Sequence, residues 1–109
     1  MIAAVTKDRI GFLEAFFPLF YNWKPGSKKL SADYVAFSKA IAWTASPLAT
    51  RECIDAFGRT DFRADLAKLD VPTLVIHGDD DQIVPIDVSG KRSAKLIAGA
   101  RLAVIKDAP

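Results

Sequence analysis

The sequence has 109 residues, of which 50% are hydrophobic and 26% are charged, a composition typical of a globular domain and not of a disordered chain. The formal net charge of +2 is too small an excess to indicate binding to nucleic acid or to an anionic membrane surface. The longest apolar run, Ala15 to Tyr21, is far shorter than the roughly 20 residues of a membrane-spanning helix. Since the N-terminus also lacks a secretory pattern, we expect a cytoplasmic protein with no membrane or nucleic-acid partner.

The first half of the chain predicts helices. Apolar residues at three- and four-residue spacing predict a helix over 3–17, which Pro18 should end or kink. Ser31 is typical of the residue that caps a second helix, and Ser46 followed by Pro47 is typical of the start of a third. We expect this third helix to end near residue 57, with Gly58 in the left-handed conformation.

The second half predicts alternating strands and helices. After a short helical turn over 64–68, residues 71–77 form an apolar run rich in β-branched side chains, as in a parallel strand buried on both faces. Gly78 should end this strand, and Pro85 should open a helix over 87–98 that stops at Gly99. Residues 101–105 predict a second strand. The order strand, helix, strand indicates an α/β fold with parallel strands, of which two alone make an incomplete sheet.

Single residues limit the possible chemistry. One cysteine, Cys53, excludes an internal disulfide and a zinc cluster built from cysteines, and the one histidine is His77. Asp79, Asp80 and Asp81 do not fit a calcium-binding loop, because Ile83 stands where a third oxygen ligand would be needed. We therefore expect no metal and no cofactor. His77 ends a strand, where we interpret it as a structural histidine.

The loop after the first strand carries the functional signal. The pattern Gly78-x-x-Asp81-x-x-Val84-Pro85 places an acid beyond the carboxyl end of a buried strand, where it could orient a neighbouring imidazole. This pattern resembles the acid loop of the α/β-hydrolase fold. More narrowly, the chain resembles the cofactor-free haloperoxidases and their arylesterase and perhydrolase-like relatives, most closely over residues 60–63, 70–79 and 106–109.

The resemblance implies a partial α/β-hydrolase fold, with a helical cap segment at 1–57 and the carboxy-terminal part of a mainly parallel core at 58–109. It implies that Asp81 is the acid of a Ser-acid-His triad, although a solvated turn aspartate would share its sequence context. Phe12, Phe16 and Ile83 match residues that line the substrate pocket of relatives, whereas aromatic stripes more often reflect core packing. No glycines bracket a serine at elbow spacing, so we expect a fragment of a longer chain, with the triad histidine directly after Pro109.

By resemblance, the parent is a serine-dependent hydrolase of small carboxylic esters, with perhydrolase and haloperoxidase activity when hydrogen peroxide and halide are present. The 109-residue chain alone is predicted to be inactive. Two alternatives stay open: a non-enzymatic interaction module, which would need neither serine nor second histidine, and a dehalogenase with a carboxylate nucleophile on the same fold.

Overall fold

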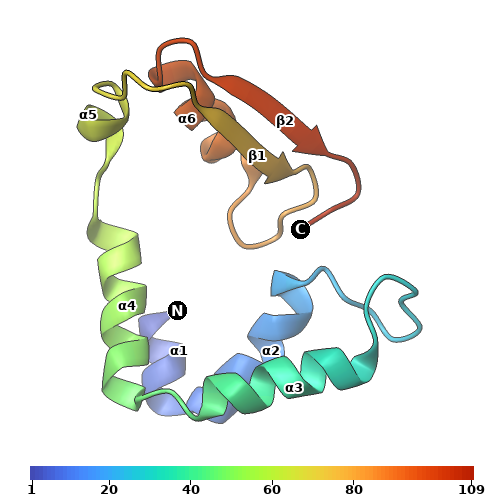
Figure 1. Ribbon diagram of the computed structural model, residues 1–109. Coiled ribbons are helices and arrows are strands. Elements are labelled where there is room, and N and C mark those ends of the chain that lie inside the picture. Colours follow the sequence, from blue (N-terminus) through green and yellow to red (C-terminus); the bar gives the residue numbers. More distant parts are fainter. The chain divides into compact units, whose positions relative to one another are not determined.

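The computed structural model describes all of residues 1–109 and divides them into two units, Met1–Thr60 and Asp61–Pro109 (Figure 1). The first unit is helical. The second is built from two parallel strands with helical segments between and before them. The α/β character and the order of elements in the second unit are as the sequence predicts.

The first predicted helix is two helices. Helix α1 spans Ile2–Lys7 and helix α2 spans Arg9–Phe20, and Asp8 between them has an extended backbone. Asp8 Oδ1 accepts a hydrogen bond from Gly11 N at 2.9 Å, so Asp8 caps α2 and separates it from α1. Of the two outcomes expected at Pro18, an end or a kink, the structure contradicts the first. Pro18 lies inside α2, because a proline removes only its own hydrogen bond and residues beyond it can stay helical.

The other two helices of this unit begin where their caps predict. Helix α3 spans Ala32–Trp43 and helix α4 spans Pro47–Arg59, with the hydroxyls of Ser31 and Ser46 accepting hydrogen bonds from the first turns. The predicted end of α4 is wrong, since Gly58 is helical. The helix instead ends at Arg59 and is capped by Thr60, whose N–H and hydroxyl both bond to the carbonyl of Ala56.

The helices of the first unit are joined by a small core and by one arginine. Val5, Leu13 and Val35 are its buried apolar residues. The guanidinium of Arg9, at the start of α2, donates to the carbonyl oxygens at the end of α3 and just beyond it; the acceptors are those of Ala42, Trp43 and Ala45, at 3.3, 2.9 and 3.0 Å. A cation at a helix C-terminus also interacts favourably with the helix dipole.

The second unit begins with a one-turn helix, α5 (Arg63–Leu66), and then forms a β-α-β arrangement (Figure 1). Strand β1 (Leu74–Gly78) pairs in parallel with strand β2 (Arg101–Ile105), with Leu74 opposite Arg101 and Gly78 opposite Ile105. Between the strands lie a 3₁₀ helix, η1 (Ile86–Val88), and helix α6 (Gly90–Leu96). Gly99 adopts a positive φ of 72° and, as predicted, ends the helical passage before β2.

Three details of the second unit differ from expectation. β1 starts at Leu74 and not at residue 71, and Gly78 belongs to the strand, since it pairs with Ile105. The predicted helix over 87–98 is split at Ser89, whose backbone is not helical. At this break, Ser89 Oγ donates to the carbonyl of Pro85 at 2.8 Å.

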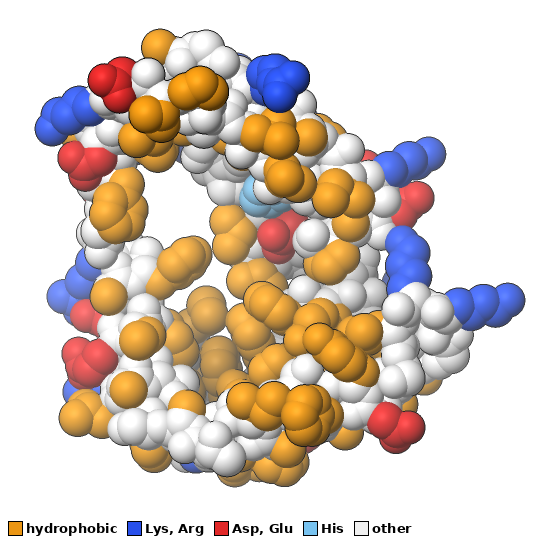
Figure 2. Space-filling model, in the orientation of Figure 1, with side chains coloured by type: hydrophobic (Ala, Val, Ile, Leu, Met, Phe, Trp, Pro, Cys, Tyr) orange, Lys and Arg blue, Asp and Glu red, His pale blue; other side chains and the backbone are white.

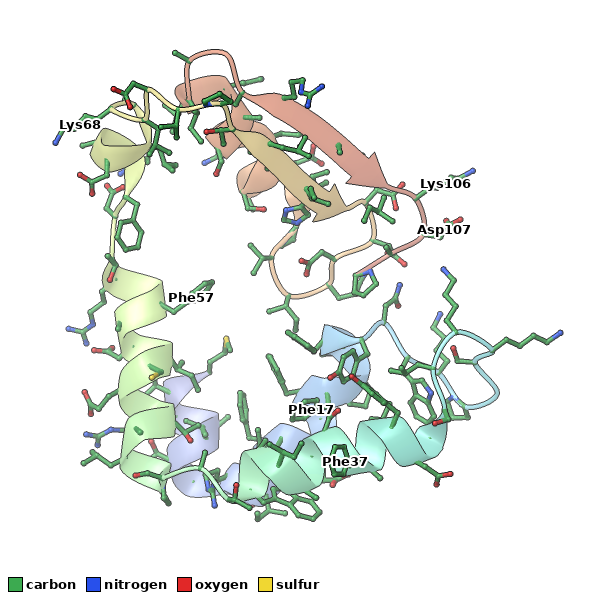
Figure 3. All side chains as sticks on the ribbon, in the orientation of Figure 1. Phe17, Phe37, Phe57, Lys68, Lys106 and Asp107 are labelled. Atoms are coloured by element: carbon green, nitrogen blue, oxygen red, sulfur yellow. The ribbon has the colours of Figure 1, made fainter.

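Much apolar surface is exposed, because two strands alone cannot cover both of their own faces. Ile86 and Ile97 are buried in the second unit, but Leu74 and Ile76 of β1 are 48% and 59% exposed. In the first unit, hydrophobic side chains gather over the helices in Figure 2, and Phe37 projects from α3 in Figure 3.

No helix combines the length and the apolar character that crossing a membrane requires.

Candidate active site

The loop after β1 holds Asp81 in a fixed turn. Asp81 Oδ1 accepts hydrogen bonds from Ile83 N at 2.9 Å and from Val84 N at 2.8 Å. The carboxylate therefore closes its own loop, as Asp side chains do in Asx turns. The other oxygen, Oδ2, accepts neither bond and lies 3.4 Å from His77 Nε2. With its side chain 23% exposed, Asp81 is partly covered and is positioned by two backbone donors.

His77, at the penultimate position of β1, forms a hydrogen bond with Val84 at the end of this loop. Its Nε2 lies 2.9 Å from the carbonyl oxygen of Val84, and because a carbonyl oxygen only accepts, Nε2 carries the hydrogen in this contact. Ser89 Oγ donates to the same carbonyl at 3.3 Å. The imidazole, pale blue in Figure 2, is only 14% exposed. It bridges the strand to residue 84.

The second ring nitrogen of His77 is covered by Gly90. A Cβ at Gly90 would lie 2.7 Å from His77 Nδ1, which places the glycine backbone directly against the ring. A general base needs one nitrogen on the acid and the other open to the nucleophile. His77 has Nε2 on Val84 and Nδ1 against Gly90, so its geometry suits a structural role.

The loop after β1 and the turn after β2 are bonded to each other. Asp79 N donates to the carbonyl of Ile105 at 3.1 Å, and Asp80 N donates to that of Ala108 at 3.0 Å. Asp79 Oδ1 accepts from Asp107 N at 2.7 Å, across 28 residues of sequence. Asp107, labelled in Figure 3 just after β2, has a positive φ of 53°. The carboxyl ends of both strands thus share one edge, as a parallel sheet requires.

Gly78 allows the turn after β2 to lie directly against the end of β1. A Cβ on Gly78 would collide with the backbone carbonyl oxygens of Ala108 and Pro109, and no shift of a side chain could relieve that contact. The glycine predicted to end the strand instead stays in it and lets the turn after β2 lie directly against the strand end.

The predicted substrate-pocket residues fall into both units. Ile83 is half-buried on the acid loop, where its N–H bonds to Asp81. Phe12 and Phe16 belong to α2 in the first unit, where their rings stack with centroids 5.7 Å apart. Phe20 continues the stack, its centroid 5.5 Å from that of Phe16. The three rings form a continuous aromatic face along α2.

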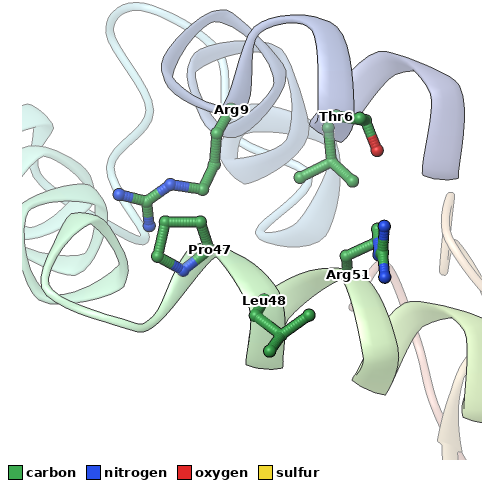
Figure 4. Close-up of a pocket in the computed structure, with 6 residues that line it drawn as sticks. Thr6, Arg9, Pro47, Leu48 and Arg51 are labelled. Atoms are coloured by element: carbon green, nitrogen blue, oxygen red, sulfur yellow. The ribbon is translucent and has the colours of Figure 1, made fainter.

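A cavity of about 330 Å³ lies elsewhere, within the first unit between α1, the start of α2, and α4 (Figure 4). None of the predicted site residues lines it; its walls are Val5, Thr6, Arg9, Pro47, Leu48 and Arg51. Arg9 already bonds to carbonyls of the α3 terminus, and Arg51 pairs with Glu52. The cavity therefore offers no unsatisfied cation for an anionic ligand.

The acidic residues of the loop do not converge. Asp79 accepts a hydrogen bond from Asp107 N, Asp80 accepts one from Gln82 Nε2 at 2.6 Å, and Asp81 accepts those of its own loop. The structure holds no group of three or more acidic, histidine or cysteine side chains able to bind a metal. A carboxyl group with a strongly lowered pKa lies outside the loop, at Asp61. The Arg63 guanidinium bonds to Asp61 and lowers the pKa of that carboxyl to about 2.

Known proteins match this chain in sequence and in structure. A non-heme chloroperoxidase of Kitasatospora aureofaciens is 48% identical over 85 residues, which are 74% of this chain and 29% of that protein. A bifunctional esterase/perhydrolase of Acinetobacter calcoaceticus is 51% identical over 83 residues, 76% of this chain and 30% of that protein. The chain is a homologue of the non-heme haloperoxidases. No protein-family model matches it.

The structural comparison assigns the fold of this haloperoxidase homologue. The crystal structure of a bromoperoxidase from Bacillus anthracis matches with a TM-score of 0.91 at 40% identity, over 98% of this chain and 39% of that one. The fold is therefore part of the α/β-hydrolase fold, which confirms the fold class and the family resemblance. The haloperoxidase homologue spans 29% to 39% of the length of these relatives.

Two features of the site could not be read from the sequence. The bond between Asp79 and Asp107 joins residues far apart in the chain, and the adjacent aspartates give no sign of which one reaches across. The contact between His77 and Gly90 depends on where η1 ends, and the sequence places a continuous helix there. Only the parallel pairing of the two strands could have indicated that residues 79 and 107 meet.

Proposed function

We propose that this chain is the cap segment (1–57) and the acid-bearing part of the core (58–109) of a serine-dependent α/β hydrolase that cleaves small carboxylic esters. The homology to haloperoxidases and to an esterase/perhydrolase supports the reaction class. The observation that carries the role of Asp81 is its anchoring. Two backbone donors hold Oδ1, so the carboxylate is fixed at the edge of the sheet where functional groups of this fold gather.

Asp81 would act through a histidine that follows Pro109 in the longer protein. The carboxylate would hold that imidazole in one tautomer and stabilise its charged form, while the imidazole takes the proton of a serine supplied by an upstream elbow. The serine attacks the ester carbonyl, the alcohol leaves, and water hydrolyses the acyl-enzyme to release the acid. Backbone N–H groups beside the serine would stabilise the oxyanion.

Perhydrolysis follows from the same acyl-enzyme. Hydrogen peroxide replaces water as the nucleophile, so a peracid leaves and the serine is regenerated. The peracid then transfers one oxygen to a halide ion, giving hypohalous acid and the carboxylate. The substrates of the proposed enzyme are thus a small ester and, for the second activity, hydrogen peroxide and halide.

Phe12, Phe16 and Ile83 are proposed to bind the acyl group. The stacked rings of α2 offer an apolar face, and Ile83 lies two residues after the proposed acid, with its backbone bonded to that acid. Apolar walls with a few fixed polar groups are the usual form of a small-molecule site. Replacement of Phe16 by Ala should therefore change the preference between acetate and longer acyl esters more than it changes acetate turnover.

The test is the substitution Asp81→Asn in the full-length protein that contains this chain. The hydrolysis of p-nitrophenyl acetate should fall by about 10²- to 10⁴-fold in kcat with the fold retained, because an amide cannot hold the correct tautomer. Asp87→Asn is the matched control, since Asp87 lies in the same unit and its carboxylate bonds to Lys91. Turnover of Asp81→Asn equal to that of the control would contradict the role of Asp81.

A further inference from the structure

We infer that Asp79 is a positioning residue, which fixes the turn after β2 against the acid loop and so sets the distance between Asp81 and the residue that follows Pro109. The inference rests on the proposed function, because the position after Pro109 matters to catalysis only if it carries the triad histidine. The bond from Asp107 N to Asp79 Oδ1 is the observation that carries it.

The turn after β2 needs an acceptor at this point. Asp107 adopts a left-handed conformation at φ 53°, which is uncommon for a residue with a side chain and turns the chain back toward β1. Its N–H then points away from the strand ladder, and Asp79 Oδ1 accepts it at 2.7 Å. An ionised carboxylate accepts more strongly than a neutral carbonyl, so Asp79 can stabilise this turn.

Two backbone bonds beside Asp79 place the segments on either side of the turn. Asp79 N continues the strand pairing by bonding to Ile105 O, and Asp80 N reaches Ala108 O. Between these two acceptors lies the N–H of Asp107, whose bond is to the side chain of Asp79. The carboxylate of Asp79 therefore secures the one turn residue of unusual backbone geometry.

The consequence for the site is geometric. Asp79 and Asp81 belong to the same rigid loop, and Asp107 lies two residues before Pro109. The position of the chain beyond Pro109 relative to Asp81 therefore depends on two hydrogen bonds between the acid loop and this turn. These are the bond of Asp107 N to Asp79 Oδ1 and the bond of Asp80 N to the carbonyl of Ala108. A misplacement of about 1 Å between catalytic groups can lower turnover about 100-fold. Loss of the Asp79 contact should act on turnover and leave the binding of the ester largely unchanged.

Three substitutions of Asp79 test this in the full-length protein, assayed with p-nitrophenyl acetate. Asp79→Ala removes the acceptor, Asp79→Asn keeps an acceptor oxygen at the same position without the charge, and Asp79→Glu keeps the charge but displaces the oxygen. We expect Asp79→Ala and Asp79→Glu to lower kcat by about tenfold or more with KM within about twofold, and Asp79→Asn to restore most of the turnover. Asp87→Ala is the matched control and should retain wild-type kcat.

The outcomes separate this inference from the proposed function. Asp79→Ala with the kcat of the Asp87→Ala control overturns the inference, and so does an active Asp79→Glu beside an inactive Asp79→Asn, since charge and not position would then matter. If Asp79→Ala does not fold, the comparison of the Asn and Glu variants still decides. An inactive Asp81→Asn together with an unaffected Asp79 series rejects only the positioning role, whereas an active Asp81→Asn rejects the proposed triad acid.

Discussion

The imidazole of His77 rests on the backbone of Gly90, so closely that a Cβ there would lie 2.7 Å from Nδ1. This contact fixes the ring that bonds to the carbonyl of Val84, and through it the end of the acid loop. Gly90 is therefore required for close approach and not for an unusual φ, because its backbone begins α6.

Gly90→Ala should destabilise the protein by about 1–3 kcal/mol, because the added methyl group must displace a mostly covered ring. Thermal unfolding of the full-length variant, followed by circular dichroism, measures the loss. Gly58→Ala is the matched control. Gly58 lies in α4, where an added Cβ would meet nothing within 4 Å, so the same change there should stabilise the helix by about 0.5–1 kcal/mol. Equal effects of both substitutions would contradict the close-contact explanation.

His77→Gln should lower stability by about 1 kcal/mol and leave ester hydrolysis within a few-fold of wild type. The amide of glutamine can still donate to the carbonyl of Val84, which also accepts from Ser89 Oγ, so the loss is moderate. The measurement pairs a melting temperature with kcat for p-nitrophenyl acetate. Complete inactivity in a variant that melts like the wild type would assign His77 to the chemistry instead.

The carboxyl of Asp61 should titrate with a midpoint near 2, because Arg63 donates to it from both side chain and backbone. Since this folded-state pKa lies below the ordinary value of 3.8, the pair stabilises the fold above the ordinary pKa, and the effect is lost as the pH falls through about 2. Carbon-13 NMR of the carboxyl group measures the midpoint. Arg63→Gln should return it toward 3.8.

Asp87 serves as the internal control for that titration. Its pKa is also lowered, but by the side-chain hydrogen bond from Lys91, so Arg63→Gln should leave it unchanged. A shift of both carboxyl groups in Arg63→Gln would show a general change of structure and would contradict the local explanation.

The 109-residue chain by itself should neither hydrolyse p-nitrophenyl acetate nor melt cooperatively. It contains no serine at elbow spacing, and a two-stranded sheet with exposed Leu74 and Ile76 is only marginally stable in water. Circular dichroism during heating, together with sedimentation of the sample, tests the second statement. A sharp transition of a monomer would show that the chain needs no further sheet.

Local signals in the sequence were sufficient where a structure depends on near neighbours. The caps at Ser31 and Ser46, the second strand and the stop at Gly99 were predicted because each depends on a few adjacent residues. The break at Asp8 was missed, since the apolar spacing continues across it while the cap acts through a side-chain oxygen.

Features that depend on tertiary contacts could not be predicted in the same way. The sequence after Pro85 has the right composition for a continuous helix, but the structure divides it at Ser89, whose backbone is not helical. In the candidate site, the proposed role of Asp81 rests on its place in a motif. The partner of Asp79 depends on the register of two strands, and neither strand's sequence specifies that register.

The end of α3 is completed by a different helix. The guanidinium of Arg9 in α2 donates to the carbonyls of Ala42, Trp43 and Ala45, of which that of Ala42 also accepts from Ala45 N at 3.2 Å. Fraying of α3 from this end would release the guanidinium, and melting of α2 would remove the side-chain donor that these carbonyls share. The two helices should therefore open together, as one unit in hydrogen exchange, and a lysine, with its single ammonium group, could not replace the planar fork that links them.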